Sequence, residues 1–126
     1  MLYDNRPKYL NLLKIKLPIS GIISIFHRLT GLVLFLFIPV SLYWLQLSVK
    51  DPASFQQLSS LMLHPLSRFF FLLVIWSLVH HLITGLRFLL LDMEFFLSRK
   101  SSAVSAWGVV VIEVLVMAAV IIGWFL

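Results

Sequence analysis

The sequence predicts an all-α membrane protein with three transmembrane helices, and two observations support this fold class. The chain has 126 residues, of which 61% are hydrophobic and 12% are charged, about half the charged fraction of a soluble domain. Three apolar stretches, residues 22–47, 66–91 and 103–125, are each long enough to cross a bilayer, which takes about 20 helical residues. A chain this short has too much surface for so few polar groups to fold in water. We therefore expect residues 1–126 to form a single membrane-anchor domain.

The N-terminal segment, residues 1–20, carries the charges that precede the first span. Lys14 and Lys16 alternate with apolar residues in this segment, which is typical of a segment that lies at the membrane interface. Pro18 marks the start of the first span. Pro39 lies inside that span, where a proline favours a kink.

The segment between the first two spans, residues 48–65, is predicted to be a polar loop. It begins with the turn signal Lys50-Asp51-Pro52. It continues with the polar residues Ser54, Gln56, Gln57, Ser59 and Ser60.

The distribution of Lys and Arg predicts how the spans are oriented. Six basic residues precede the first span or lie between the last two, and two flank the other connection; the six are Arg6, Lys8, Lys14, Lys16, Arg99 and Lys100, and the two are Lys50 and Arg68. The positive-inside rule places the N-terminus on the cytoplasmic or matrix side and the C-terminus on the opposite side. The net charge of +5 therefore favours membrane orientation over binding to nucleic acid.

A first polar cluster inside a span consists of Ser24, His27, Arg28 and Gly31. Their i, i+3, i+4, i+7 spacing predicts one helical face. A charged side chain inside a span costs about 2.5–3.5 kcal/mol on insertion scales, so it usually faces protein, water or a ligand. These side chains offer hydrogen-bond donors to a carboxylate or a carbonyl group. The alternative is structural, with Arg28 reaching the lipid headgroups and His27 bonding a neighbouring helix.

A second cluster, in the second span, contains His80, His81, Thr84, Gly85 and Arg87. His81, Thr84 and Gly85 share a face, and Gly85 lets a flat group approach the backbone. An imidazole about 16 Å from the inner end of the span needs a partner, and the iron of a b-type haem is one. His80 and His81 point about 100° apart, so only one of them can face such a haem. A hydrogen-bonded pair of histidines between helices is the alternative.

Glu113 lies near the middle of the third span, where a carboxylate must be paired or protonated. Its neighbours one turn away are apolar, so its own helix supplies no partner. Glu113 and His80 lie at matching depths, about 15–16 Å from the inner ends of their spans. We predict a hydrogen bond between His80 and Glu113, with Ser77 as the second choice. The alternative is a neutral Glu113 that bonds a backbone carbonyl or a partner chain.

Two motifs resemble the succinate dehydrogenase cytochrome b556 subunits. They are Ser24-x-x-His27-Arg28-x-x-Gly31 and His81-x-x-x-Gly85-x-Arg87-x-x-x-x-Asp92. The resemblance covers nearly the whole chain, and it implies the same three spans as one half of a haem-binding helical bundle. It also implies that a second small three-span anchor subunit pairs with this chain, that the two share haem b, and that an iron–sulfur subunit and a flavoprotein subunit dock on the inner side.

The resemblance further assigns roles to individual residues. It implies that His81 is the axial ligand of the haem iron, that His27 and Arg28 lie near the haem propionates, and that Ser24 and Arg28 belong to the site of ubiquinone reduction. Arg87 lies in the same inner half and is a further cation for a propionate. No catalytic centre is expected in this chain itself, and the expected location is the bacterial inner (cytoplasmic) membrane or the mitochondrial inner membrane.

Two other functions are compatible with these residues. One is the anchor subunit of a fumarate reductase, which runs the reverse reaction. The other is a small non-redox membrane protein, in which Arg28 and His81 would be structural and no b-type spectrum would be found.

Overall fold

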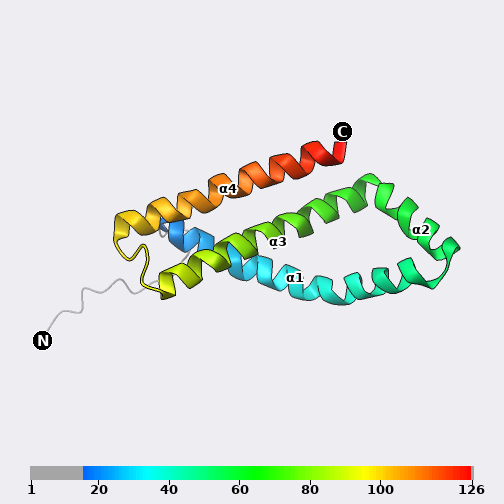
Figure 1. Cartoon of the computed structure of the whole chain (residues 1–126), viewed down its shortest axis with the longest axis horizontal. Helices are drawn as coiled ribbons and strands as arrows, with labels where there is room; N and C mark the ends of the chain where they lie inside the picture. The colour runs from blue at the N-terminus through cyan, green and yellow to red at the C-terminus, as the bar shows by residue number, and fades with distance from the viewer. Residues whose placement is uncertain (1–15, 126) are drawn as a thin grey trace, which may run out of the picture.

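The computed structural model describes residues 16–125, which form four α-helices and no strand (Figure 1). The helices are α1 (Ile19–Lys50), α2 (Pro52–Leu63), α3 (Pro65–Asp92) and α4 (Arg99–Phe125). Helices α1, α3 and α4 are each long and apolar enough to cross a membrane. The three predicted spans are therefore confirmed, and each helix extends beyond its predicted span at one or both ends. The predicted interfacial segment lies almost wholly outside the described residues.

Helix α3 contacts both α1 and α4 and runs antiparallel to both, and the start of α1 also packs against α4 (Figure 1). The burial pattern is the inverse of that of a soluble bundle. In the described part of the chain the buried polar or charged side chains outnumber the buried apolar ones; the former are Thr30, Ser77, His80, Thr84, Arg87 and Glu113, and the latter are Ile23, Leu58, Ala106 and Val109. Leucine, phenylalanine and valine side chains cover the outer surface, as expected where lipid replaces water and polar groups bond across helices.

Residues 52–63 form helix α2, so the prediction of a polar loop there was wrong. Asp51 caps this helix, because its carboxylate accepts hydrogen bonds from the Ser54 backbone N–H at 2.7 Å and the Ser54 hydroxyl at 2.8 Å. Pro52 occupies the first turn, where its missing N–H costs nothing. Leu58 is buried, whereas Gln56 is exposed. The Ser and Gln residues therefore do not prevent a helix in this segment.

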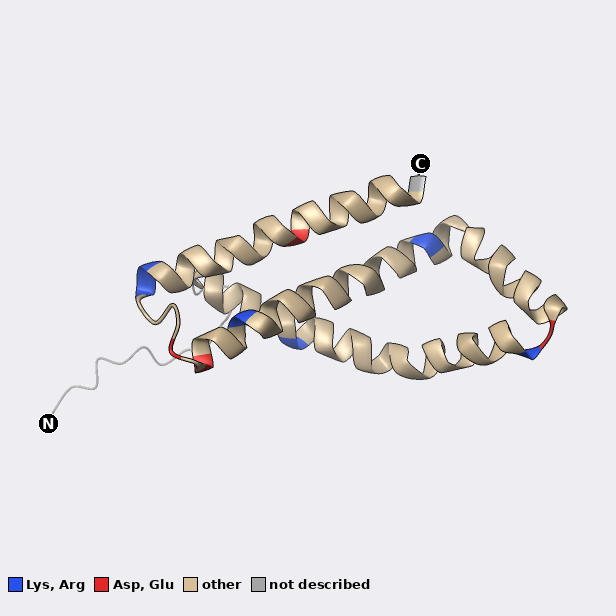
Figure 2. Cartoon of the chain, in the orientation of Figure 1, with Lys and Arg blue, Asp and Glu red and all other residues tan. Residues whose placement is uncertain are grey.

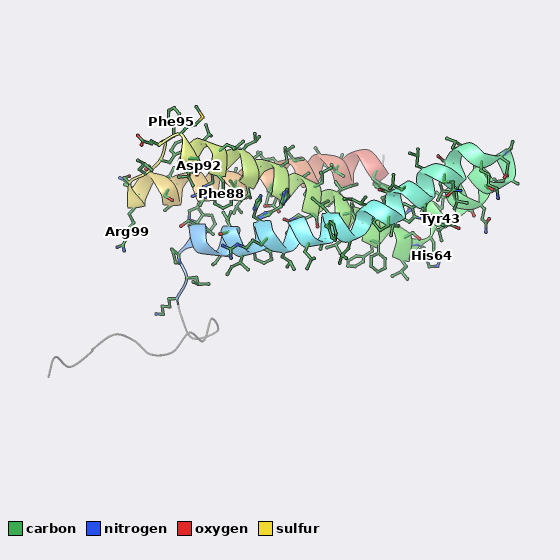
Figure 3. The ribbon with its side chains drawn as sticks, turned by 90° about the horizontal axis from the view of Figure 1, so that it is seen from below. Tyr43, His64, Phe88, Asp92, Phe95 and Arg99 are labelled. Atoms are coloured by element: carbon green, nitrogen blue, oxygen red, sulfur yellow. The ribbon has the colours of Figure 1, made fainter. Side chains whose placement is uncertain are left out.

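Charged residues lie mainly toward the two ends of the bundle, while basic positions on α1 and α3 and an acidic position midway along α4 lie farther inside (Figure 2). Phe88, Asp92 and Arg99 lie toward one end, which we call the α3–α4 loop end, and Tyr43 and His64 lie toward the other, the α2 end (Figure 3). Helix α1 continues as one curved helix through the proline at position 39 (Figure 1).

Candidate functional site

His27 of α1 and His81 of α3 stack against each other where these two helices meet. Their ring centroids lie 4.1 Å apart, and the rings are within 8° of parallel. Nδ1 of His81 donates a hydrogen bond to the backbone carbonyl oxygen of His27 at 3.1 Å, because a carbonyl oxygen can only accept. In a neutral imidazole this leaves the lone pair on Nε2. Nε2 of His81 forms no hydrogen bond with any residue from 16 to 125.

Two glycines create the space for these rings. A Cβ atom on Gly31 would lie 3.0 Å from Cε1 of His81, and one on Gly85 would lie 3.5 Å from Nε2 of His27. The flat group that approaches Gly85 is therefore the imidazole of His27 in this same chain. Phe88 completes the contact, with its ring edge-on to His27 at 5.1 Å between centroids. The glycines of both motifs therefore make room for the packing of α1 against α3.

The structure separates the members of the first cluster. His27 is half-buried against α3, whereas Arg28 is exposed and Ser24 is half-buried. Successive helical residues point about 100° apart, so a helix that turns His27 inward turns Arg28 toward the outside of the chain. Nε2 of His27 is buried and has no hydrogen-bond partner among residues 16–125. Buried polar atoms are nearly always hydrogen-bonded, so this nitrogen needs a partner from elsewhere.

The predicted bond between His80 and Glu113 is confirmed. Nδ1 of His80 lies 3.0 Å from Oε2 of Glu113, and only 4% of His80 and 9% of Glu113 is exposed. The Thr84 hydroxyl lies 3.4 Å from Nε2 of His80. The rings of Phe26 and Trp76 enclose the imidazole, with centroids 6.1 Å and 5.7 Å away. Both ring nitrogens of His80 are therefore occupied within the chain.

Two residues one turn from His80 have roles that the sequence did not reveal. The Ser77 hydroxyl donates to the Leu73 carbonyl oxygen at 2.8 Å, so the second-choice partner of Glu113 is engaged within α3. Trp76 packs on His80, although tryptophans in membrane proteins concentrate at the interfaces. Its position well inside the span was the available signal for a packing role.

Arg87 is buried and joins α3 to α4, which the sequence analysis did not anticipate. Its Nε donates to the Ser105 hydroxyl at 2.9 Å, and its Nη2 donates to the Ser102 carbonyl oxygen at 3.0 Å and hydroxyl at 3.1 Å. The guanidinium of Arg87 is therefore hydrogen-bonded to α4, and we do not assign it to a haem propionate. The i, i+3 spacing of the two serines at the start of the third span was the signal that could have predicted this contact.

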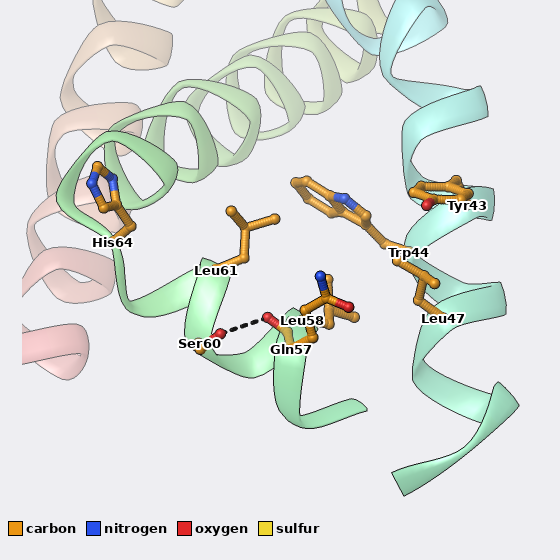
Figure 4. Close-up of a pocket in the computed structure, with 8 residues that line it drawn as sticks. All are labelled: Tyr43, Trp44, Leu47, Gln57, Leu58, Ser60, Leu61 and His64. Carbon is orange, nitrogen blue, oxygen red and sulfur yellow. Dashed lines mark hydrogen bonds between the residues drawn. The ribbon is translucent and has the colours of Figure 1, made fainter. Parts of the chain in front are cut away.

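Cavities lie at both ends of the bundle. At the α2 end, a cavity of about 470 Å³ lies between α1 and α2 (Figure 4), lined by Tyr43, Trp44, Leu47, Gln57, Leu58, Ser60, Leu61 and His64. At the other end, a cavity of about 580 Å³ lies between the starts of α1 and α4, lined by Lys16, Leu17, Pro18, Ser20, Arg99, Ser102 and Ala103. The second cavity is the closer one to Ser24, because Ser20, which lines this cavity, lies one helical turn before Ser24.

The chain is similar over most of its length to known membrane subunits. Residues 3–122 match the model of the succinate dehydrogenase/fumarate reductase transmembrane subunit family. The succinate dehydrogenase cytochrome b556 subunit of Coxiella burnetii is 35% identical over 112 residues, which is 86% of this chain and 87% of the relative. The subunit of the same name from Rickettsia prowazekii is 33% identical over 90% of this chain and 89% of the relative. That from Paracoccus denitrificans is 32% identical over 90% of each chain.

Proposed function

Because this chain belongs to the succinate dehydrogenase/fumarate reductase transmembrane subunit family, we propose that it is the cytochrome b anchor subunit of a succinate:ubiquinone oxidoreductase. In this proposal, a second three-span anchor subunit pairs with it and shares one haem b. An iron–sulfur subunit and a flavoprotein subunit dock at the inner face, and succinate is oxidised on the flavoprotein. The relatives reported above are all named as succinate dehydrogenase subunits, which favours this direction over fumarate reduction.

The observation that carries the proposal is the hydrogen bonding of His81. Histidines that bind metals almost always donate their other ring N–H to a carbonyl, carboxylate or water. Nδ1 of His81 donates to the His27 carbonyl oxygen, and Nε2 is left as the nitrogen with a lone pair. The residues present thus fit haem ligation through Nε2 of His81. When bound there, the haem would supply an iron that accepts and releases one electron. We assign the second axial ligand to the partner anchor subunit.

The unpaired nitrogen of His27 supports a propionate contact. Nε2 of His27 is buried and lacks a partner among the described residues. A propionate carboxylate would accept a hydrogen bond from its N–H, and the positive charge of the neighbouring Arg28 favours an anion nearby. His27 therefore has two roles, because its backbone carbonyl oxygen orients His81 while its side chain faces the propionate.

The quinone site is assigned to Ser24 and Arg28. These residues lie one helical turn apart, and Ser24 follows by one turn Ser20, which lines the cavity at the α3–α4 loop end. Arg28 is exposed on the outside of this chain, where a partner subunit and a quinone can reach it. Reduction places negative charge on the quinone carbonyl oxygens, and donors that are in position beforehand stabilise that charge. Ser24 and Arg28 are donors of this kind.

The quinone assignment predicts a split between two activities of the purified complex. Ser24→Ala and Arg28→Leu each remove one donor to a developing charge, so succinate:ubiquinone reduction should fall by about tenfold or more. Succinate oxidation by an artificial acceptor that draws electrons before the membrane site should stay at the wild-type rate. Ser41→Ala is the matched control, because the Ser41 hydroxyl donates to the Ile38 carbonyl oxygen far from Ser24. A parallel loss of both activities in the Ser24 and Arg28 variants would refute the assignment.

A further inference from the structure

We propose that Glu113 is a positioning residue, which keeps His80 away from the haem iron and fixes the rotation of α3 that presents His81. The proposal rests on the proposed function, because it concerns which of two adjacent histidines binds the haem. His80 and His81 lie at nearly the same depth, and each has a nitrogen that could bind iron. The surroundings of the two rings must therefore decide which histidine binds the iron.

The surroundings of His80 differ from those of His81. Glu113 and Thr84 engage both ring nitrogens of His80, and the side chain is buried among aromatic rings. His81 has one ring nitrogen engaged, by the His27 carbonyl oxygen. His80 faces α4, so it could reach an iron held beside His81 only by leaving the Glu113 carboxyl group, which would then be buried without its partner. Glu113 thus makes ligation by His80 unfavourable.

The rotation of α3 is fixed by a polar stripe, which we define as the buried residues of this helix: Ser77, His80, Thr84 and Arg87. All four are polar and follow a helical repeat, so they lie on one face. Two of them bond α4, with His80 contacting Glu113 and Arg87 contacting Ser102 and Ser105. These two contacts are seven residues apart on α3, about 10 Å along the helix axis. Two bonds at different heights hold the stripe toward α4, and His81 consequently faces α1.

The interaction with Glu113 is the only one in the described chain that reaches Nδ1 of His80. Replacing Glu113 with leucine would leave that N–H in an apolar, membrane-embedded site. An unsatisfied polar group of this kind gains free energy from any new partner. If the proton moves from Nδ1 to Nε2, Nδ1 is left with a lone pair that could bind the iron of a haem held beside the next residue.

The test is the electron paramagnetic resonance spectrum of the oxidised, purified complex containing the full chain. Wild type should show one low-spin ferric haem signal. Glu113→Leu should add a second low-spin signal from molecules in which His80 has displaced His81. The double variant Glu113→Leu/His80→Phe should lose the second signal, because phenylalanine keeps the aromatic volume and has no ligating nitrogen. Glu113→Gln should keep the single signal, since its amide oxygen accepts the same hydrogen bond.

Two further variants separate this role from general packing. Ser105→Ala weakens the other bond between α3 and α4 and should keep the single signal. Thr84→Val removes the second partner of His80 with little change of shape and leaves Glu113 on Nδ1, so it should also keep the single signal. Glu113→Ala, which removes the same carboxyl group, decides the question if Glu113→Leu fails to assemble.

The outcomes distinguish the inference from the proposed function. A single wild-type signal in Glu113→Leu, or in Glu113→Ala when Glu113→Leu does not assemble, would overturn the role of Glu113. Loss of haem in Glu113→Leu that His80→Phe does not reverse would also overturn it, because a packing defect does not depend on a competing ligand. A wild-type complex without b-type haem would instead refute the proposed function.

Discussion

At the scale of single residues, Gly31 and Gly85 differ in the room that they leave for a side chain. A Cβ atom on Gly31 would come within 3.0 Å of His81, whereas one on Gly85 would make an ordinary contact of 3.5 Å with His27. We expect Gly31→Ala to displace the His81 ring and destabilise the complex by about 1–3 kcal/mol, the usual cost of overpacking. Gly85→Ala should have a smaller effect.

The ratio of haem to flavin in the purified complex measures this difference, together with the midpoint of thermal unfolding. Gly31→Ala should show less haem and a lower midpoint than Gly85→Ala. Equal losses in the two variants would contradict the geometry of the stacked histidines.

Single-residue contacts were predictable from the sequence where few partners were possible. Glu113 has apolar neighbours in its own helix and a histidine at matching depth in the neighbouring helix α3. Its bond to His80 could therefore be predicted. The stacking of His27 on His81 did not follow, because residue spacing defines a face and not the helix that it meets. The role of Arg87 depends on the rotation of α4 against α3, which the pattern of a single helix does not contain. Trp76 lies one turn before His80 in the same helix, so that spacing could have predicted their contact.

At the scale of helices, the contact between Arg87 and α4 gives a graded prediction. Ser105→Ala removes the described acceptor of Nε, whereas Ser102→Ala leaves the Ser102 backbone carbonyl to accept from Nη2. Hydrogen bonds between membrane helices contribute about 0.6–1.7 kcal/mol, so Ser105→Ala should lower the unfolding midpoint and Ser102→Ala should lower it less. Ser101→Ala is the control, since its hydroxyl bonds Ser98 near the same helix end. The reverse order of the two main variants would be inconsistent with these bonds.

Helix existence was predictable for the three spans and not for α2. The long apolar stretches leave a membrane helix as the only structure that satisfies its own backbone. The segment 52–63 is short and rich in Ser and Gln, and this polar composition predicted a loop. Asp51 and Pro52, which are typical of the start of a helix, predicted the opposite. The capping bond from the Ser54 backbone N–H to Asp51 shows that this local signal was the better guide.

At the scale of the whole molecule, the distribution of basic residues predicts which end faces the cytoplasm or matrix. The chain contains no cysteine, so single introduced cysteines can be labelled without background. Gln56 and Lys100 are both exposed and lie near opposite ends of the bundle. Gln56→Cys should react with an impermeant maleimide added to the outer side of the membrane, and Lys100→Cys should react only when the inner side is opened. The reverse labelling pattern would show that the chain is inserted the other way.

The central claim is that this chain supplies His81 as one axial ligand of a haem b shared with a partner subunit. The most direct measurement is the reduced-minus-oxidised absorption spectrum of the assembled complex, purified through this chain. The wild-type complex should show a b-type band, His80→Ala should retain most of it, and His81→Ala should lose most or all of it with the subunits still assembled. An assembled His81→Ala complex with the full wild-type band, or equal loss in the two variants, would contradict the claim.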